Sequence, residues 1–172
     1  IVNSMVRLGY DVTIYSLNFL QEDNWTDIYR DLDKKIELVT SYARANFDKF
    51  IDNRKNYYDL IWVSRPHNME FVFDKISDFK NVKVIYDAEA IFSDRAIEKV
   101  KLTGEEIDVE KVLKTELSLS DYADAVVAVK EKDAQLFSEH GKEQTHILNV
   151  AFPPPKYLAP FSVRNDILFV GN

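Results

Sequence analysis

Apolar residues along this chain follow two spacings that alternate, and the alternation predicts strands and helices in turn. Short runs rich in aliphatic, β-branched or aromatic residues predict strands at 11–16, 36–39, 59–64, 82–86, 125–129 and 145–149. Apolar residues three and four positions apart predict helices at 1–8, 41–53, 66–76, 93–103, 104–120 and 130–140. The run at 125–129 has no polar alternation, which is typical of a parallel strand covered on both faces.

This order of elements predicts the fold class. Strand and helix alternate at least five times, which indicates right-handed crossovers and an α/β fold with one open, doubly wound parallel sheet of the Rossmann-like type. The chain opens inside an amphipathic helix, so we expect the first strand, which would be central in the sheet, to be missing. We hypothesise that Ile167–Val170, a run of similar apolar character, fills that position, in cis or from a neighbouring molecule.

Proline placement predicts the domain limits. Pro153, Pro154 and Pro155 stand in a row, which favours an extended, semi-rigid spacer. We therefore expect a Rossmann-like domain over 1–152, an interdomain linker over 153–166, and the first strand of a truncated second domain over 167–172.

Composition removes several classes of function. The net charge of -7 comes without a basic stripe, which argues against a nucleic-acid partner. The chain has no cysteine, so disulfides, thiolate metal sites and cysteine nucleophiles are excluded. Its four glycines are far apart, so neither a GxGxxG turn nor a GxxxxGK phosphate loop is present. The three histidines lack zinc-site spacing, and we predict no metal site.

Polar side chains gather at the ends of two predicted strands, which is where ligands bind in open α/β sheets. After the strand at 59–64, Arg65 could bind a phosphate or carboxylate in bidentate fashion and His67 could donate to a sugar hydroxyl. The structural alternative is that Arg65 pairs with a nearby carboxylate and that His67 belongs only to a first helical turn.

The second strand end carries Asp87 and Glu89, followed by Arg95 in the next predicted helix. The two carboxylates could orient an acceptor hydroxyl, or one of them could assist its deprotonation. The structural alternative is a helix N-terminus, with Ser93 or Asp94 as its cap and an ordinary Glu89–Arg95 salt bridge.

The succession of a helix, the run "YADAVVAV" at 122–129, a second helix and "HILNV" at 146–150 resembles the acceptor-side domain of GT-B sugar transferases. The resemblance is closest to the large retaining family numbered four. Two features depart from that family. Lys130 stands where a small hydroxyl residue would cap the following helix, and many members have histidine where Asp87 or Glu89 falls.

The resemblance implies a glycosyltransferase that moves a sugar from a nucleotide-sugar donor to a hydroxyl acceptor with retention of configuration. The nucleotide sugar would be a co-substrate, not a bound cofactor, held mainly by a second domain beyond Asn172. Gly171 and Asn172 would face the donor phosphates, and Asp87, Glu89, Arg65, His67 and Arg95 would face a sugar, glycan or lipid acceptor. This chain alone is expected to be inactive. A cytoplasmic location and a homo-oligomer through the truncated sheet are further expectations. Membrane-surface association is common in the resembled family, but no basic amphipathic stretch in this sequence supports it.

Two other functions stay open on the sequence. The chain could be a non-catalytic Rossmann-like binding or scaffolding module. It could also belong to a nucleotide-sugar epimerase that shares the two-domain architecture, an inference that rests on fold analogy.

Overall fold

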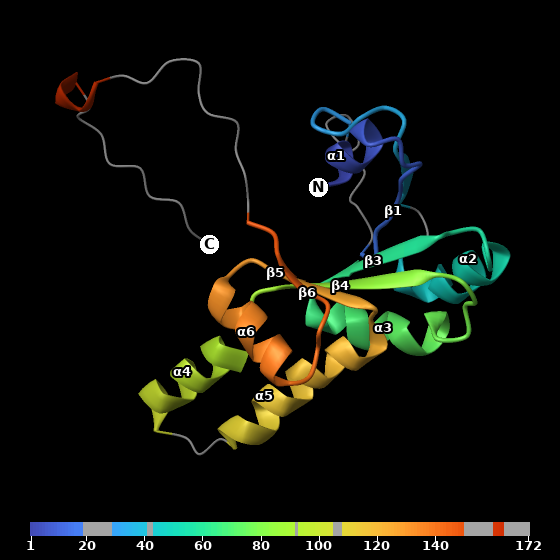
Figure 1. The fold of residues 1–172 in the computed structure, drawn as a ribbon. Coiled ribbons are helices and arrows are strands. Elements are labelled where there is room, and N and C mark those ends of the chain that lie inside the picture. Colours follow the sequence, from blue (N-terminus) through green and yellow to red (C-terminus); the bar gives the residue numbers. More distant parts are fainter. Residues whose placement is uncertain (19–28, 41–42, 92, 105–107, 150–159, 164–172) are drawn as a thin grey trace.

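The computed structural model describes residues 1–18, 29–40, 43–91, 93–104, 108–149 and 160–163 (Figure 1). Strands and helices alternate along the chain as the sequence predicts. In chain order the elements are α1 (Val2–Arg7), β1 (Thr13–Tyr15), β2 (Glu37–Val39), η2 (Arg44–Asn46), α2 (Phe47–Asn53), β3 (Leu60–Ser64), α3 (Pro66–Ile76), β4 (Lys83–Glu89), α4 (Ser93–Thr103), α5 (Val109–Leu117), η3 (Ser118–Tyr122), β5 (Ala125–Ala128), α6 (Glu131–Glu139), β6 (Thr145–Ile147) and η4 (Phe161–Val163).

The main sheet has four strands in the order β3-β4-β5-β6, and every neighbouring pair is parallel. The strands follow one another in sequence order, so right-handed crossovers place their connecting helices on one face. Figure 1 shows α3, α5 and α6 together on that face. The predicted fold class is confirmed: this is an α/β, Rossmann-like fold whose parallel sheet alternates with helices.

The expectation of one continuous sheet is wrong for the described residues. β1 and β2 form a separate two-stranded parallel sheet, and β1 does not pair with β3. Strand-forming residues predict that a segment is extended, but its partner depends on contacts far along the chain. The gap between the two sheets lies where the missing first strand is expected from the sequence.

Several predicted features of the C-terminal region lie outside the described residues. The strand at Ile167–Val170, and with it the hypothesis that it completes the sheet, falls there. Most of the predicted linker and the predicted domain limit near Pro153 also lie outside the described residues. Within 153–166 the structure describes 160–163, where Phe161–Val163 forms a 3-10 turn.

The core lies between the four-stranded sheet and its helices. α3 buries Met69, Val72 and Ile76. Tyr86 of β4 and Phe137 of α6 are both fully buried, and their rings meet edge to face at 6.1 Å between centroids. This packing fixes the edge of the sheet at which the candidate side chains lie.

The helix ends show where local signals were correct and where they were not. The helix predicted over 104–120 begins at Val109, because the Asp108 side chain accepts a hydrogen bond from the Lys111 backbone N–H at 3.0 Å. Lys130 precedes α6 without a side-chain cap, as predicted. The longest described helices have 11 residues, and none of the described helices is both long and apolar enough to cross a membrane.

Candidate functional site

The carboxyl ends of β3 and β4 lie side by side, which brings two of the predicted site segments together. Ser64 pairs in register with Asp87, and the Arg65 backbone N–H donates to the Asp87 carbonyl at 2.8 Å. Both strands run in the same direction, so Arg65 and Glu89 leave the sheet at one edge. This is the edge at which ligand binding is predicted from the sequence.

Asp87 is the buried centre of this edge, with 6% of its surface exposed. One carboxylate oxygen accepts hydrogen bonds from Trp62 Nε1 at 3.1 Å and Ser64 Oγ at 3.2 Å. The other accepts from the Glu89 backbone N–H at 3.1 Å. Both oxygens are therefore engaged, and Asp87 fixes the relative position of the two strand ends.

Arg65 and Glu89 form an ion pair above Asp87. Arg65 Nε lies 3.2 Å from each Glu89 carboxylate oxygen, and the two side chains are 54% and 39% exposed. The Arg65 Nη1 and Nη2 groups have no hydrogen-bond partner among the described residues. An exposed pair of this kind contributes only about 0–1 kcal/mol to folding. Its free donors and its carboxylate are instead well placed to contact a polar ligand.

Both members of the pair sit on unusual backbone. Arg65 has φ 79° and Glu89 has φ 56°, in the region that favours glycine. The register between β4 and β5 shifts between Asp87 and Glu89, so Ala88 forms an irregularity at the strand end. Such conformations cost roughly 1–3 kcal/mol each and concentrate at functional sites. Two of them joined by one ion pair favour a functional interpretation of this edge.

The other predicted residues lie apart from the pair or outside the described part. His67 is exposed on the first turn of α3 and makes no hydrogen bond to Arg65 or Glu89. Arg95 lies on α4, but its side chain is not among those described. Gly171 and Asn172 are also outside the described residues.

The structural alternatives for these residues are realised in part. Arg65 does pair with a nearby carboxylate, namely Glu89. Ser93 opens α4, yet its backbone N–H donates to Glu116 Oε2 from another helix at 2.7 Å. The helix N-terminus is thus stabilised by a carboxylate that the sequence analysis did not single out.

Sequence reasoning missed four residues that shape the site. Trp62 and Ser64, both on β3, donate hydrogen bonds to Asp87 but were not among the predicted site residues. Glu116 and Asp133 are acidic yet buried, at 9% and 3% exposure. Their place on the apolar side of α5 and α6 was the available signal, since buried carboxylates are rare without partners.

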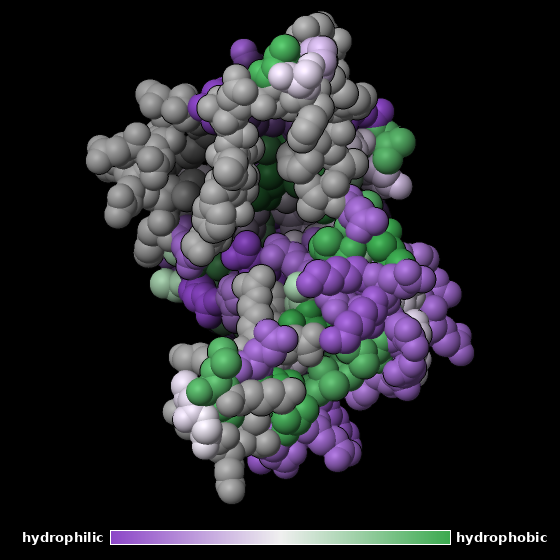
Figure 2. All heavy atoms as spheres, turned by 90° about the vertical axis from the view of Figure 1, so that its left-hand side faces the viewer, coloured by the Kyte–Doolittle hydropathy of each residue, from purple (hydrophilic) through white to green (hydrophobic). Residues whose placement is uncertain are grey.

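The carboxyl edge of the sheet faces the side drawn in Figure 2, where hydrophilic side chains gather across the middle of the surface. No group of three or more potential metal ligands occurs in the part of the chain that the structure describes. The described edge therefore offers carboxylate oxygens and guanidinium donors. These groups suit hydroxyl-rich or anionic ligands.

The chain matches no protein-family model, no curated protein and no solved structure. The fold defines an α/β domain with a parallel, Rossmann-like sheet. Any more specific assignment depends on the geometry of the Arg65–Glu89 edge and on the resemblance of 116–149.

Proposed function

We propose that this chain is the acceptor-side domain of a retaining sugar transferase, and that its carboxyl sheet edge binds the acceptor. The resemblance of the helix–strand–helix–strand segment at 116–149 supports this class. The position of the polar residues supports the site, since open α/β sheets bind ligands at the carboxyl ends of their strands. The nucleotide-sugar donor would be held by a second domain.

In this proposal each residue has a separate role. The Glu89 carboxylate accepts a hydrogen bond from the acceptor hydroxyl, while the Nη groups of Arg65 donate to a second acceptor oxygen. Asp87 holds the Glu89 backbone. His67 and Arg95 would contact more distant parts of the acceptor.

The transfer itself would form one bond and break one. The acceptor oxygen bonds to the anomeric carbon, the bond from that carbon to the donor phosphate breaks, and the nucleoside diphosphate leaves with the electron pair. The acceptor proton passes to the departing phosphate oxygen or to solvent. A fixed carboxylate at the acceptor hydroxyl contributes mainly by orientation.

One observation carries the proposal: an exposed Arg65–Glu89 pair whose two residues both hold left-handed backbone at the ligand-binding edge. The ion pair stabilises the fold by less than the two strained residues cost. Stability alone therefore does not explain why both residues hold this backbone conformation.

The test is product analysis with the complete gene product. It is incubated with a panel of nucleotide sugars and hydroxyl acceptors, and glycosylated products are detected by mass spectrometry. We expect wild type to form product, and Glu89→Gln and Arg65→Gln each to lower kcat/KM at least about 10-fold, as loss of an oriented polar contact does.

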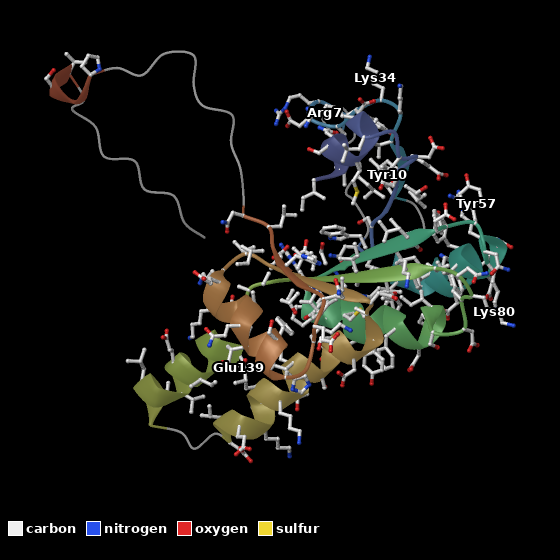
Figure 3. All side chains as sticks on the ribbon, in the orientation of Figure 1. Arg7, Tyr10, Lys34, Tyr57, Lys80 and Glu139 are labelled. Atoms are coloured by element: carbon white, nitrogen blue, oxygen red, sulfur yellow. The ribbon has the colours of Figure 1, made fainter. Side chains whose placement is uncertain are left out.

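Matched controls use the same substitutions away from the edge. Arg7 lies on α1 and Glu139 is the last residue of α6, so both are outside the strand ends that form the site (Figure 3). Arg7→Gln and Glu139→Gln should leave kcat/KM unchanged. A donor converted to its epimer would indicate the epimerase instead. Absence of any turnover, or equal loss in the controls, would overturn the proposal.

A further inference from the structure

The chain from the last residue of β4 to the first residue of α4 is held by three carboxylates from three different elements. The backbone N–H of Glu89 donates to Asp87 of β4 at 3.1 Å. The N–H of Ile91 donates to Asp133 of α6 at 3.3 Å, and that of Ser93 donates to Glu116 of α5 at 2.7 Å. Every second N–H from residue 89 to residue 93 thus has a carboxylate acceptor.

All three acceptors are buried, at 6%, 3% and 9% exposure for Asp87, Asp133 and Glu116. Burying a carboxylate is costly, and it is costlier in a chain whose net charge is already -7. A neutral carbonyl or hydroxyl oxygen would satisfy a backbone N–H as well. Hydrogen bonds to charged acceptors are stronger than those to neutral ones. The three carboxylates therefore hold the segment more rigidly, at a cost in folding free energy.

The segment begins at the strained residue of the site. Glu89 has φ 56° and follows the irregularity in β4. A strained residue keeps its conformation only when surrounding contacts over-determine it. The Arg65 ion pair, which is exposed, is too weak to do this alone.

We propose that Asp87, Asp133 and Glu116 form a three-carboxylate clamp that holds Glu89 in its strained conformation against Arg65. Asp133 and Glu116 are thereby positioning residues, since they act on the site through the backbone of residues 91 and 93 and not by touching the acceptor. This inference rests on the proposed function for its consequence, the preorganised acceptor site, but the clamp itself has a separate readout.

The clamp is tested by pairs of substitutions that keep or remove the acceptor oxygen. Asp133→Asn and Glu116→Gln each retain an amide oxygen that accepts a hydrogen bond, whereas Asp133→Ala and Glu116→Ala do not. Amide hydrogen exchange measured by NMR reports on the N–H groups of Glu89, Ile91 and Ser93. Urea unfolding of the same variants identifies those that keep the global fold.

We expect the alanine variants to lose at least about 10-fold in exchange protection at Ile91 or Ser93 and at Glu89, beyond any change in global stability. The Asn and Gln variants should keep most of it. Glu131→Ala, on the exposed first turn of α6 two residues before Asp133, is the control and should change nothing. Acceptor KM should rise in the alanine variants and recover in the amide variants.

The outcomes separate the two proposals. Unchanged protection at Glu89, Ile91 and Ser93 in both alanine variants overturns the clamp, whatever the activity. Lost protection with unchanged KM also overturns it, because the segment then does not position the site. Lost protection in a protein that turns over no sugar supports the clamp and overturns the proposed function.

Discussion

The two sheets of this protein are built from the same kinds of strand and helix, yet among the described residues only the four-stranded sheet has a helix that buries apolar side chains against it. Helix α3 beside the four-stranded sheet buries three residues, Met69, Val72 and Ile76. Helix α1 beside the two-stranded sheet buries none, and Ile1 and Leu8 are 57% and 76% exposed. A helical apolar stripe therefore does not guarantee burial, because it also needs a sheet face to cover.

The two-stranded sheet is attached to the rest of the molecule by a few specific contacts. Tyr15 packs against Phe47 and Phe50, with ring centroids 5.2 and 4.5 Å away. Arg54 at the end of α2 binds Glu37 of β2 at 2.5 Å. The four-stranded sheet instead shares a continuous core with its helices, and the candidate site lies on that rigid part.

The largest expected effect compares the only two methionines of the chain. Met69 is 0% exposed on α3, and Met5 is half-buried on α1. Met69→Ala leaves a cavity and should lower the free energy of unfolding by about 2–5 kcal/mol, whereas Met5→Ala should cost less than about 1 kcal/mol. Urea unfolding measures both. Equal costs would show that α1 is as well packed as α3.

The next effect is at the strand ends of the four-stranded sheet. Asp87→Ala leaves three part-buried donors without their acceptor and should destabilise the fold by about 2–4 kcal/mol. Asp87→Asn keeps one acceptor oxygen and should cost less. Asp74→Ala, at an exposed position of α3, should stay within about 0.5 kcal/mol of wild type. If Asp87→Ala left the free energy of unfolding unchanged in thermal or urea unfolding, the hydrogen bonds to Asp87 would not stabilise the fold.

A smaller, pH-dependent effect is expected from the attachment of the two-stranded sheet. The hydrogen bond from Arg54 lowers the pKa of Glu37 from 4.5 to about 2. The folded state thus binds this proton less readily, so the stabilisation is complete above pH 4.5 and is lost as the pH falls towards 2. Because the Glu37 side chain is 45% exposed, solvent screening keeps the effect of Glu37→Gln at pH 7 below about 1 kcal/mol.

Unfolding measured from pH 7 down to pH 2 tests this. The difference between wild type and Glu37→Gln should disappear at the acid end. Asp124 provides the comparison in the four-stranded sheet, where the hydrogen bond from Lys83 lowers its pKa in the same direction. If the difference in free energy of unfolding between wild type and Glu37→Gln grew as the pH fell, the lowered pKa of Glu37 would be contradicted.

The sequence predicts the strands well and their partners poorly. The strands predicted at 59–64 and 125–129 correspond to Leu60–Ser64 and Ala125–Ala128. The meeting of Arg65 and Asp87 was foreseeable, since parallel strands bring their carboxyl ends to one edge. The bond from Ile91 to Asp133 spans 42 residues and depends on the register and on the irregularity at Ala88. No local pattern contains that information.

The smallest expected change in stability is also the sharpest test of the site. Glycine adopts φ 56° without strain, so Glu89→Gly releases backbone strain while it loses a weak ion pair and gains unfolded-state entropy. The free energy of unfolding should change by less than about 1 kcal/mol in either direction. Product formation by the complete gene product should nevertheless be lost, because the carboxylate is gone.

Asn56→Gly is the matched control, because Asn56 has φ 65° and is exposed beyond the end of α2. It should leave both stability and product formation close to wild type, since asparagine already tolerates this conformation. If Glu89→Gly kept full activity, Glu89 would be a structural residue only. If it destabilised the fold by several kcal/mol, the Arg65–Glu89 pair would be a structural contact of the four-stranded sheet, and the strain at this edge would need another explanation than ligand binding.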